Sequence, residues 1–464
     1  MNLQYIDLIH QTYDFPQDGF RVEDDYLKFN EVPLKYMIET FGTPFKMTYL
    51  PKVNEHINKS RTMFQKAFQE HDYDGEYVYT YCTKSSHFSY ILNRVLDEKV
   101  HLELSSAYDV DIIKRLAASG KLPLATYIVC NGYKTRAYLD GMLDLMKMGY
   151  TNVIPILDHT DEIDFYAAFD VPTVQLGLRL ATEEEPDFDL YTSRFGIKHQ
   201  YLPRFYKERI ASNPKFKLVM LHFFIYTGIK DSIYYWTELN RSINVYCQIK
   251  SMAPDLMALN IGGGMPIRNS LSFEFDYEYM IGEIVRQIKK SCQQSNIKEP
   301  NIFTEFGSYT VGESGASIYQ VLGEKRQNDR EVWYLINNSL ITTLPDTWGL
   351  QKKFILLAIN KWNSDYQRVI LGGLTCDNDD YYDSEANNGR VYLPIINRYD
   401  EPLYIGFFHT GAYQESLGGY GGIQHCLIPS PKHILVDKDE NGEFTYTIFA
   451  PEQNSDQVMT TLGY

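Results

Sequence analysis

Residues 77–104, YVYTYCTKSSHFSYILNRVLDEKVHLEL, contain one complete strand–helix–strand pattern. Aromatic and β-branched residues predict a strand at Tyr77–Tyr81, a helical pattern follows at Ser86–Glu98, and His101–Leu104 is a second short strand. Strands that alternate with helices form parallel sheets. About eight repeats of this pattern follow one another along the chain, so the sequence predicts a closed (β/α)8 barrel.

The rest of the predicted barrel follows the same rhythm. Its other candidate strands are Phe45–Tyr49, Ala125–Cys130, Asn152–Ile156, Thr173–Leu180, Leu218–Phe224, Ala258–Ile261 and Asn301–Thr304. Its other candidate helices are Val53–Glu70, Ala107–Ser119, Lys134–Met148 and Tyr277–Cys292. In such a barrel, catalytic side chains lie at the carboxyl ends of the strands.

Beyond the barrel pattern, short strands separated by turn signals replace the alternation. The candidate strands there are Glu331–Ile336, Gln367–Leu371, Arg390–Leu393, Leu403–Phe408, His433–Val436 and Phe444–Phe449. Such a pattern is typical of an antiparallel β-sandwich or β-barrel domain. We therefore expect an N-terminal segment at 1–42 that packs with the β domain, a barrel at 43–320 and the β domain at 321–464.

The charge of the chain limits its partners. The 464 residues carry a formal net charge of −16. This argues against a nucleic-acid partner, which calls for a basic surface. It is compatible with a cationic substrate, although a solvated acidic surface is the more ordinary explanation. No segment reaches the ~20 apolar residues of a membrane span, so no membrane partner is expected.

The number and spacing of the cysteines indicate the cellular compartment of the protein. None of the six is part of a CxxC pair, so neither a zinc site nor a redox pair is expected, and no metal ligands are assigned. In a chain of this length they indicate free thiols in a reducing environment. Because Met1–Asp7 lacks the basic and apolar start of a secretory signal, we expect a cytoplasmic protein.

Four features near predicted strand ends could take part in catalysis or ligand binding. Lys84 follows the strand Tyr77–Tyr81 and could form a Schiff base with a carbonyl group, although most strand-end lysines are simply solvated. Gly262–Gly264 would let backbone N–H groups approach an anion, although an ordinary tight turn fits equally well. Glu305 and Arg179 end two further strands, where a carboxylate and a guanidinium can orient a ligand.

Two segments of the predicted β domain also carry candidate residues. Cys376 stands beside Asp377 in an acidic stretch, and nearby negative charge raises the pKa of a thiol. A neutral thiol is better suited to donating a proton than to nucleophilic attack. Tyr413 follows two small residues and could present its hydroxyl to a phosphate.

Taken in order, these segments resemble the fold-type III pyridoxal 5'-phosphate (PLP) dependent decarboxylases, the superfamily of ornithine, diaminopimelate and arginine decarboxylases. That family joins an alanine-racemase-like barrel to a β domain. Within it, the chain looks most like the biosynthetic arginine decarboxylases. Four segments carry this likeness: Val129–Lys134, Thr343–Gly349, Gly373–Asp379 and Gly411–Glu415.

The resemblance implies roles in cofactor binding. Lys84 would carry PLP, and Glu305 would pair with the pyridine nitrogen, so both would be catalytic. Glu103 and Arg179 match positions that orient the cofactor. The phosphate would be bound by Gly262, Gly263, Gly264, Thr227 and Tyr413.

The resemblance also implies roles at the substrate. Cys376 would return a proton to the carbon that loses CO2. Asp377 would bind the distal cationic group of the substrate, with Asp346 or Asp379 helping. In this family the Cys-Asp segment comes from the neighbouring subunit, which implies a homodimer, or a higher oligomer, with shared active sites.

Two positions depart from the family pattern. Family members carry a His that stacks on the PLP ring, and here Phe224 replaces it, which can still stack. They also carry an Arg that grips the phosphate, where this chain has Ser308. The absence of this arginine would weaken PLP binding by roughly 10- to 100-fold unless another cation takes its place. Lys230 and His222 are the nearby basic residues in the sequence.

The expected reaction is decarboxylation of a basic amino acid, with L-arginine giving agmatine and CO2 in polyamine metabolism as the leading hypothesis. One alternative keeps the chemistry and changes the substrate to another diamino acid or a polyamine carboxylate. A second alternative is a non-catalytic homologue that has lost PLP, which the changes at Phe224 and Ser308 would motivate.

Overall fold

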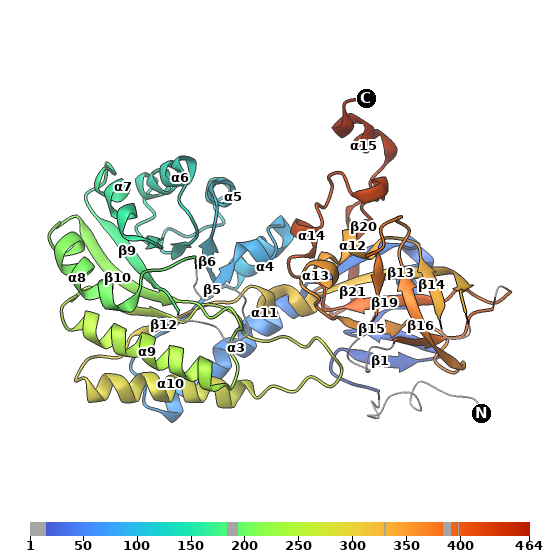
Figure 1. Cartoon of the computed structure of the whole chain (residues 1–464), viewed down its shortest axis with the longest axis horizontal. Helices are drawn as coiled ribbons and strands as arrows, with labels where there is room; N and C mark the ends of the chain where they lie inside the picture. Colours follow the sequence, from blue (N-terminus) through green and yellow to red (C-terminus); the bar gives the residue numbers. More distant parts are fainter. Residues whose placement is uncertain (1–14, 183–193, 329–330, 384–390, 398) are drawn as a thin grey trace. The chain divides into compact units, whose positions relative to one another are not determined.

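The computed structural model describes residues 15–182, 194–328, 331–383, 391–397 and 399–464 (Figure 1). Met1–Asp7 and Arg390, the first residue of one predicted strand, lie outside the described residues. Within the described part of the chain, no helix is long and apolar enough to cross a membrane.

Contacts divide the chain into two compact units. The barrel unit comprises Val53–Pro266 and Phe275–Thr310. The β unit comprises the described residues up to Lys52, the segment Ile267–Glu274 and those from Val311 onward.

A closed barrel of parallel strands forms the centre of the barrel unit, with β12 pairing back to β5. The strands are β5 Tyr77–Cys82, β6 His101–Leu104, β7 Ile128–Cys130, β8 Val153–Leu157, β9 Val174–Leu180, β10 Phe216–Phe223, β11 Ala258–Asn260 and β12 Asn301–Glu305. Val78, Val129 and Phe303 belong to a buried apolar cluster contributed by these strands. The predicted (β/α)8 barrel is therefore confirmed.

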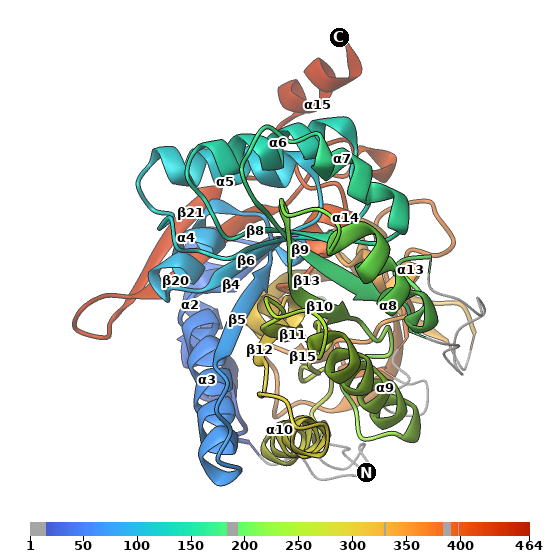
Figure 2. The same ribbon diagram turned by 90° about the vertical axis from the view of Figure 1, so that its left-hand side faces the viewer.

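Helices surround the barrel strands (Figure 2). They are α3 Pro51–Glu70, α4 Ser89–Asp97, α5 Ala107–Ala118, α6 Arg136–Lys147, α7 Ile163–Ala167, α8 Leu202–Phe205, α9 Ile233–Lys250 and α10 Tyr277–Gln294. Several begin where the sequence supplies a side-chain cap. The Ser106 and Ser232 hydroxyls, for example, accept hydrogen bonds from the first turns of α5 and α9.

The β unit contains a small sheet, β1–β2–β3, and a larger sheet of ten strands. The strands are β1 Phe20–Glu23, β2 Tyr26–Phe29, β3 Val32–Pro33, β4 Phe45–Tyr49, β13 Gly315–Arg326, β14 Val332–Ile336, β15 Ile355–Ala358, β16 Tyr366–Gly372, β17 Tyr381–Tyr382, β18 Val391–Pro394, β19 Tyr404–Phe408, β20 Lys432–Lys438 and β21 Phe444–Ala450. Its helices are α2 Leu34–Phe41, α12 Leu340–Thr343, α13 Pro345–Gly349, α14 Gln414–Leu417 and α15 Ser455–Leu462, and α11 Ser308–Val311 leads into it. Phe20 and Leu27 share a core with Phe45 and Ile434.

The structure differs from the sequence prediction in the β unit, where the long strand β13, for example, was not predicted. The sequence predicts Phe45–Tyr49 as part of the barrel segment, but β4 pairs with β13 and β20 in the β unit. All its residues are buried, and such a run does not reveal which sheet it joins. The units accordingly divide after Lys52 and Thr310. The sheet is also mixed, because β14–β16 and β4–β20 are parallel pairs.

Candidate active site at the barrel rim

Lys84 lies directly after β5, in a short 3-10 turn at Thr83–Ser85. Its Nζ donates a hydrogen bond of 2.8 Å to Oε2 of Glu103 at the end of β6. The Glu103 side chain is 0% exposed, whereas that of Lys84 is 42% exposed. A fixed, buried carboxylate therefore holds a lysine that solvent can still reach.

Two asparagine amides fix the carboxylates around this lysine. Asn131, after β7, donates from Nδ2 to Glu103 Oε1 at 3.0 Å and to Glu305 Oε1 at 2.9 Å. Asn260, the last residue of β11, donates to the same Glu305 oxygen at 2.7 Å. Among the described residues, none donates a hydrogen bond to Oε2 of Glu305. Asn131 lies in the segment Val129–Lys134 and Asn260 in the predicted strand Ala258–Ile261, but neither was predicted as a site residue.

His222 is the basic side chain beside Glu305. Its Nδ1 lies 3.8 Å from Glu305 Oε1 and has no hydrogen-bond partner. Burial, with a further contribution from the nearby Arg179, lowers the pKa of His222 to about 3. His222 is therefore neutral near pH 7, and it is not the cation that replaces the family's phosphate arginine.

Arg179 on β9 lies beside the buried carboxylate of Asp158 and the predicted site residue Phe224. Its guanidinium is 3.8 Å from Oδ1 of Asp158 and 5.9 Å from the centre of the Phe224 ring. Burial lowers the pKa of Arg179 from its usual value, but an arginine remains charged under all ordinary conditions. The structure thus brings Arg179 and Phe224 together at the rim.

A cradle of glycine backbone forms the turn after β11. Gly262 and Gly264 have φ values of 72° and 89°, which favour glycine. A Cβ on Gly264 would lie 2.7 Å from Gly228 Cα, and a Cβ on Gly263 would lie 2.4 Å from Glu305 O. Only glycine at these positions lets the turn after β11 lie so close to Gly228 and to the backbone of Glu305.

The cradle and the buried carboxylate fit a phosphate-bearing pyridine cofactor. Thr227, next to Gly228, has a buried Oγ1 with no hydrogen-bond partner, and such groups usually have one. A phosphate oxygen would satisfy it. At the other end, Glu305 is buried beside a neutral His222, and a buried carboxylate is normally paired with a cation. A protonated ring nitrogen would supply that charge.

Cys376 lies in an exposed loop after β16 of the β unit. Its Sγ is 3.6 Å from the Sγ of Cys426. The hydrogen bond with Cys426 raises the pKa of the Cys376 thiol, with a smaller contribution from Asp377. The sequence analysis attributed a raised pKa to neighbouring carboxylates, but the second thiol, which is distant in sequence, is the larger cause.

The three aspartates predicted to bind substrate differ in exposure. Asp377 and Asp379 lie on the surface, and Asp379 Oδ2 accepts a hydrogen bond from Trp348 at 3.4 Å. Asp346 is buried and already accepts a hydrogen bond from Gln414 at 2.8 Å. Asp377 and Asp379 are therefore more open to a ligand than the buried Asp346.

Asp380 was not predicted as a site residue, because a polar, acidic stretch such as 377–380 is typical of a solvated loop. The side chain is buried. One oxygen accepts from the Leu340 backbone N–H at 2.7 Å, and the other from the Thr375 hydroxyl at 2.7 Å. Asp380 therefore anchors the loop that carries Cys376.

The remaining predicted residues lie in different units. Ser308 begins α11 on the barrel unit and is partly buried. Tyr413 precedes α14 in the β unit and has a φ of 68°, which is unusual for a bulky side chain. Strained backbone of this kind persists where the surrounding structure imposes it, often at functional sites.

A family model described as the pyridoxal-binding domain of pyridoxal-dependent decarboxylases matches residues 54–312. A biosynthetic arginine decarboxylase of Prochlorococcus marinus is 19% identical over 91% of this chain and 83% of its own length. Arginine decarboxylase 2 of Arabidopsis thaliana is 21% identical over 87% of this chain and 71% of its own. The solved biosynthetic arginine decarboxylase of Campylobacter jejuni has the same fold, with a TM-score of 0.80, 19% identity, and coverage of 97% of this chain and 89% of its own.

Proposed function

Because this chain belongs to the pyridoxal-dependent decarboxylases, we propose that it decarboxylates L-arginine to agmatine and CO2. The observation that carries the choice of substrate is the similarity to arginine decarboxylases over 91% and 87% of the chain. Acidic side chains near Cys376 support it, since a carboxylate can bind a guanidinium through two parallel hydrogen bonds.

Residues of the barrel rim would hold the cofactor. Lys84 would carry PLP, Oε2 of Glu305 would accept the hydrogen bond of the protonated pyridine nitrogen, and Phe224 would stack on the ring. The glycine cradle and the Thr227 hydroxyl would hold the phosphate. When bound, PLP supplies an electron sink for the bond that breaks as CO2 leaves.

The geometry also gives roles to the carboxylate pair at Lys84. Glu103 keeps the Nζ of Lys84 within 2.8 Å and so fixes where that nitrogen points. Asn131 couples the orientation of Glu103 to that of Glu305. These hydrogen bonds would hold Lys84 and Glu305 in position before any ligand arrives, which would lower the entropic cost of assembling the site.

We also propose that the active site is shared between two subunits in the cytoplasm. Cys376 would donate a proton to the product, and Asp377 would bind the guanidinium, in the barrel of a neighbouring copy. Both residues are exposed in the single chain, which supports this arrangement. The free state of all six cysteines fits a reducing compartment.

A substrate panel tests the reaction. The purified protein with PLP is incubated separately with L-arginine, L-ornithine, L-lysine and diaminopimelate, and amines and CO2 are measured. Agmatine is expected from arginine, and Lys84→Ala should abolish it together with the visible absorbance of bound PLP. Lys147→Ala is the matched control, because this exposed lysine also lies near a carboxylate, at 3.6 Å from Asp170.

Other outcomes would contradict the proposal. Turnover of a different amino acid would overturn arginine as the substrate but would leave the proposed decarboxylation reaction in place. Bound PLP without any product would indicate a non-catalytic homologue.

Subunit sharing has its own test. Inactive Lys84→Ala and inactive Cys376→Ala proteins are mixed under conditions that exchange subunits. Sites shared across a dimer should recover up to roughly a quarter of the wild-type activity, the statistical expectation for random pairing of two variants. No recovery, with exchange verified by differently tagged chains, would show that Cys376 acts in its own subunit or not at all.

A further inference from the structure

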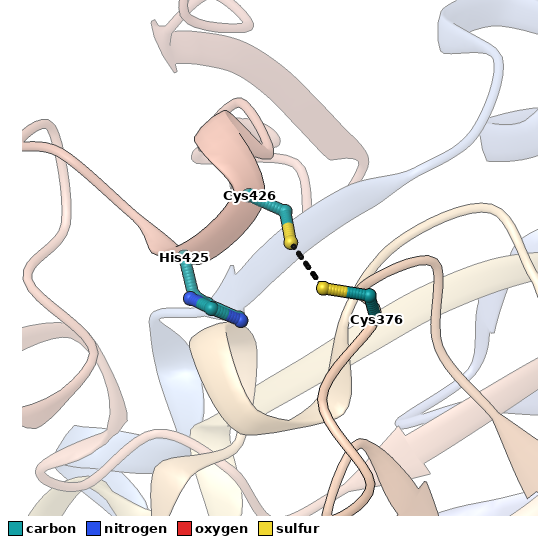
Figure 3. Close-up of side chains that lie close together, drawn as sticks. All are labelled: Cys376, His425 and Cys426. Atoms are coloured by element: carbon teal, nitrogen blue, oxygen red, sulfur yellow. Dashed lines mark hydrogen bonds between the residues drawn. The ribbon is translucent and has the colours of Figure 1, made fainter.

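Three potential metal ligands meet on the surface of the β unit (Figure 3). Cys376 comes from the loop after β16, and His425 and Cys426 come from a short 3-10 turn at His425–Leu427. Each offers one ligand atom, and these atoms all lie within 4.8 Å of one another. The three side chains are exposed in the single chain.

The spacing of the sulfurs suits a tetrahedral ion. Zinc binds thiolate sulfur at about 2.3 Å, so two sulfurs in a tetrahedral site lie about 3.8 Å apart. The Sγ atoms of Cys376 and Cys426 are 3.6 Å apart. A disulfide would require about 2.05 Å. An ion between the two sulfurs therefore needs less movement than a covalent bond between them.

The surroundings favour a cation with soft ligands. Two thiols and an imidazole form a donor set that selects zinc over the hard cations magnesium and calcium. A carboxylate oxygen of Asp377 lies 3.9 Å from Nε2 of His425 and adds negative charge beside the cluster.

The backbone holds the ligands from both sides. Cys426 and Leu427 have φ values of 53° and 54°, which non-glycine residues rarely adopt. On the other side, both the backbone N–H and the hydroxyl of Thr375, next to Cys376, donate to the buried Asp380. The loop that carries Cys376 is thus anchored to a buried carboxylate, and Cys426 lies in a tight turn.

We propose that Cys376, His425 and Cys426 form a zinc-binding site. Binding would displace both thiol protons into solvent, and water or Asp377 would complete the coordination. The sequence analysis expected no zinc site because no CxxC pair exists, but here the two thiols are 50 residues apart in sequence and meet only through the fold.

The site has a consequence that rests on the proposed function. Cys376 cannot both ligate zinc and donate a proton to product. Zinc would therefore inhibit arginine decarboxylation reversibly, and a chelator would restore it. The site is thus inhibitory rather than structural.

Cobalt binding tests the site independently of activity. The full-length protein is reduced, separated from reductant and titrated with Co²⁺, and thiolate-to-cobalt charge-transfer absorption is recorded. We expect one cobalt per chain, displaced by one equivalent of Zn²⁺. Cys426→Ser and His425→Ala should lose or greatly weaken the absorption. The control His71→Ala changes a partly exposed histidine of the barrel unit and should leave it intact.

A thiol count distinguishes metal binding from oxidation. Cys376 and Cys426 are the exposed cysteines and the other four are buried, so a thiol reagent should modify two groups in the native, reduced, metal-free protein. Zn²⁺ should protect both, and a chelator should expose them again. Loss of both thiols in air without metal, reversed only by reductant, would identify a disulfide pair and overturn the zinc site. Absence of the cobalt band, or a band unchanged in Cys426→Ser, would overturn it as well.

Inhibition is measured as the fractional loss of each variant's own metal-free activity. Zinc should inhibit wild type and His71→Ala, and Cys426→Ser should resist it. If the protein binds cobalt as expected but decarboxylates no amino acid, the proposed function fails and the metal site stands. If the enzyme is active and zinc neither binds nor inhibits, only the metal site fails.

Discussion

Asn131 shows how a single amide can organise an ionic site. Its Nδ2 donates to Glu103 and to Glu305, two carboxylates that are almost fully buried. Hydrogen bonds to charged groups contribute about 1.5–3 kcal/mol each, because a buried carboxylate without a donor has lost its hydration and gained nothing in return. Because its hydrogen bonds go to Glu103 and Glu305, Asn131 would act through these carboxylates as a positioning residue.

Asn131→Ala should therefore weaken cofactor binding. The loss of the shared donor should raise the dissociation constant for PLP by roughly 10- to 100-fold. The measurement is a titration of PLP absorbance, with the thermal midpoint of the cofactor-free protein recorded alongside. Asn152→Ala is the control, since its exposed amide donates only to the Ala125 carbonyl, at 3.0 Å. An unchanged PLP affinity in Asn131→Ala would show that the two carboxylates hold their positions without it.

The turn after β11 owes its shape to close contact with the turn after β10. Gly264 accepts a hydrogen bond from the Ile229 backbone N–H at 2.9 Å, and Gly228 packs against it with a φ of 79°. The two turns bring Thr227 and the backbone of Gly262–Gly264 to one end of the barrel. The proposed binding surface for the phosphate would therefore be a product of backbone packing rather than of charged side chains.

Gly264→Ala should disrupt this element. The new Cβ would meet Gly228 Cα at 2.7 Å in a backbone conformation that already disfavours alanine. We expect loss of PLP binding and a lower midpoint of urea unfolding. Gly120→Ala is the control that separates the effect of a steric clash from that of backbone strain. Gly120 also has a positive φ, of 72°, but no atom lies within 4 Å of its Cβ position. If both variants behave alike, the close approach of the turns is not what requires glycine.

Both units bury histidines that remain neutral. Burial is the main cause, lowering the pKa to about 3 for His222 in the barrel unit and to about 4 for His409 and His433 in the β unit. In the unfolded chain each titrates near its usual pKa of about 6.5. Below that pH the unfolded state binds protons that the folded state cannot accept. The stabilising contribution of these neutral, buried histidines is therefore complete above about pH 6.5. It is lost progressively as the pH falls towards 4.

Acidification from pH 7 to pH 5 should lower the midpoint of urea unfolding. Each such histidine contributes up to about 1.4 kcal/mol per pH unit over the window in which only the unfolded chain is protonated. His433→Gln should flatten the dependence, since glutamine does not titrate. His71→Gln, at a partly exposed position, should retain the wild-type slope. Identical slopes for wild type and His433→Gln would refute the assignment.

The sequence by itself determined the barrel and most of its rim. Periods of apolar residues are local, so the strands appear close to where the pattern predicts them. Because parallel strands of one barrel end at one face, Lys84, Arg179 and Glu305 were predictable from the sequence as residues of one rim. Glu103, which only the family resemblance pointed to, contacts Lys84 directly in the structure.

Only the tertiary structure decided which distant segments pair. β4 joins the β unit because β13 and β20 lie beside it, and five buried residues in a row look the same in either sheet. The bridge by Asn131, the burial of Asp380 and the meeting of Cys376 with Cys426 likewise depend on long-range packing. Local sequence patterns specify helices and strands. Contacts between side chains that are remote in sequence are set by the free energy of the whole fold, so no rule about residue spacing could reveal these contacts.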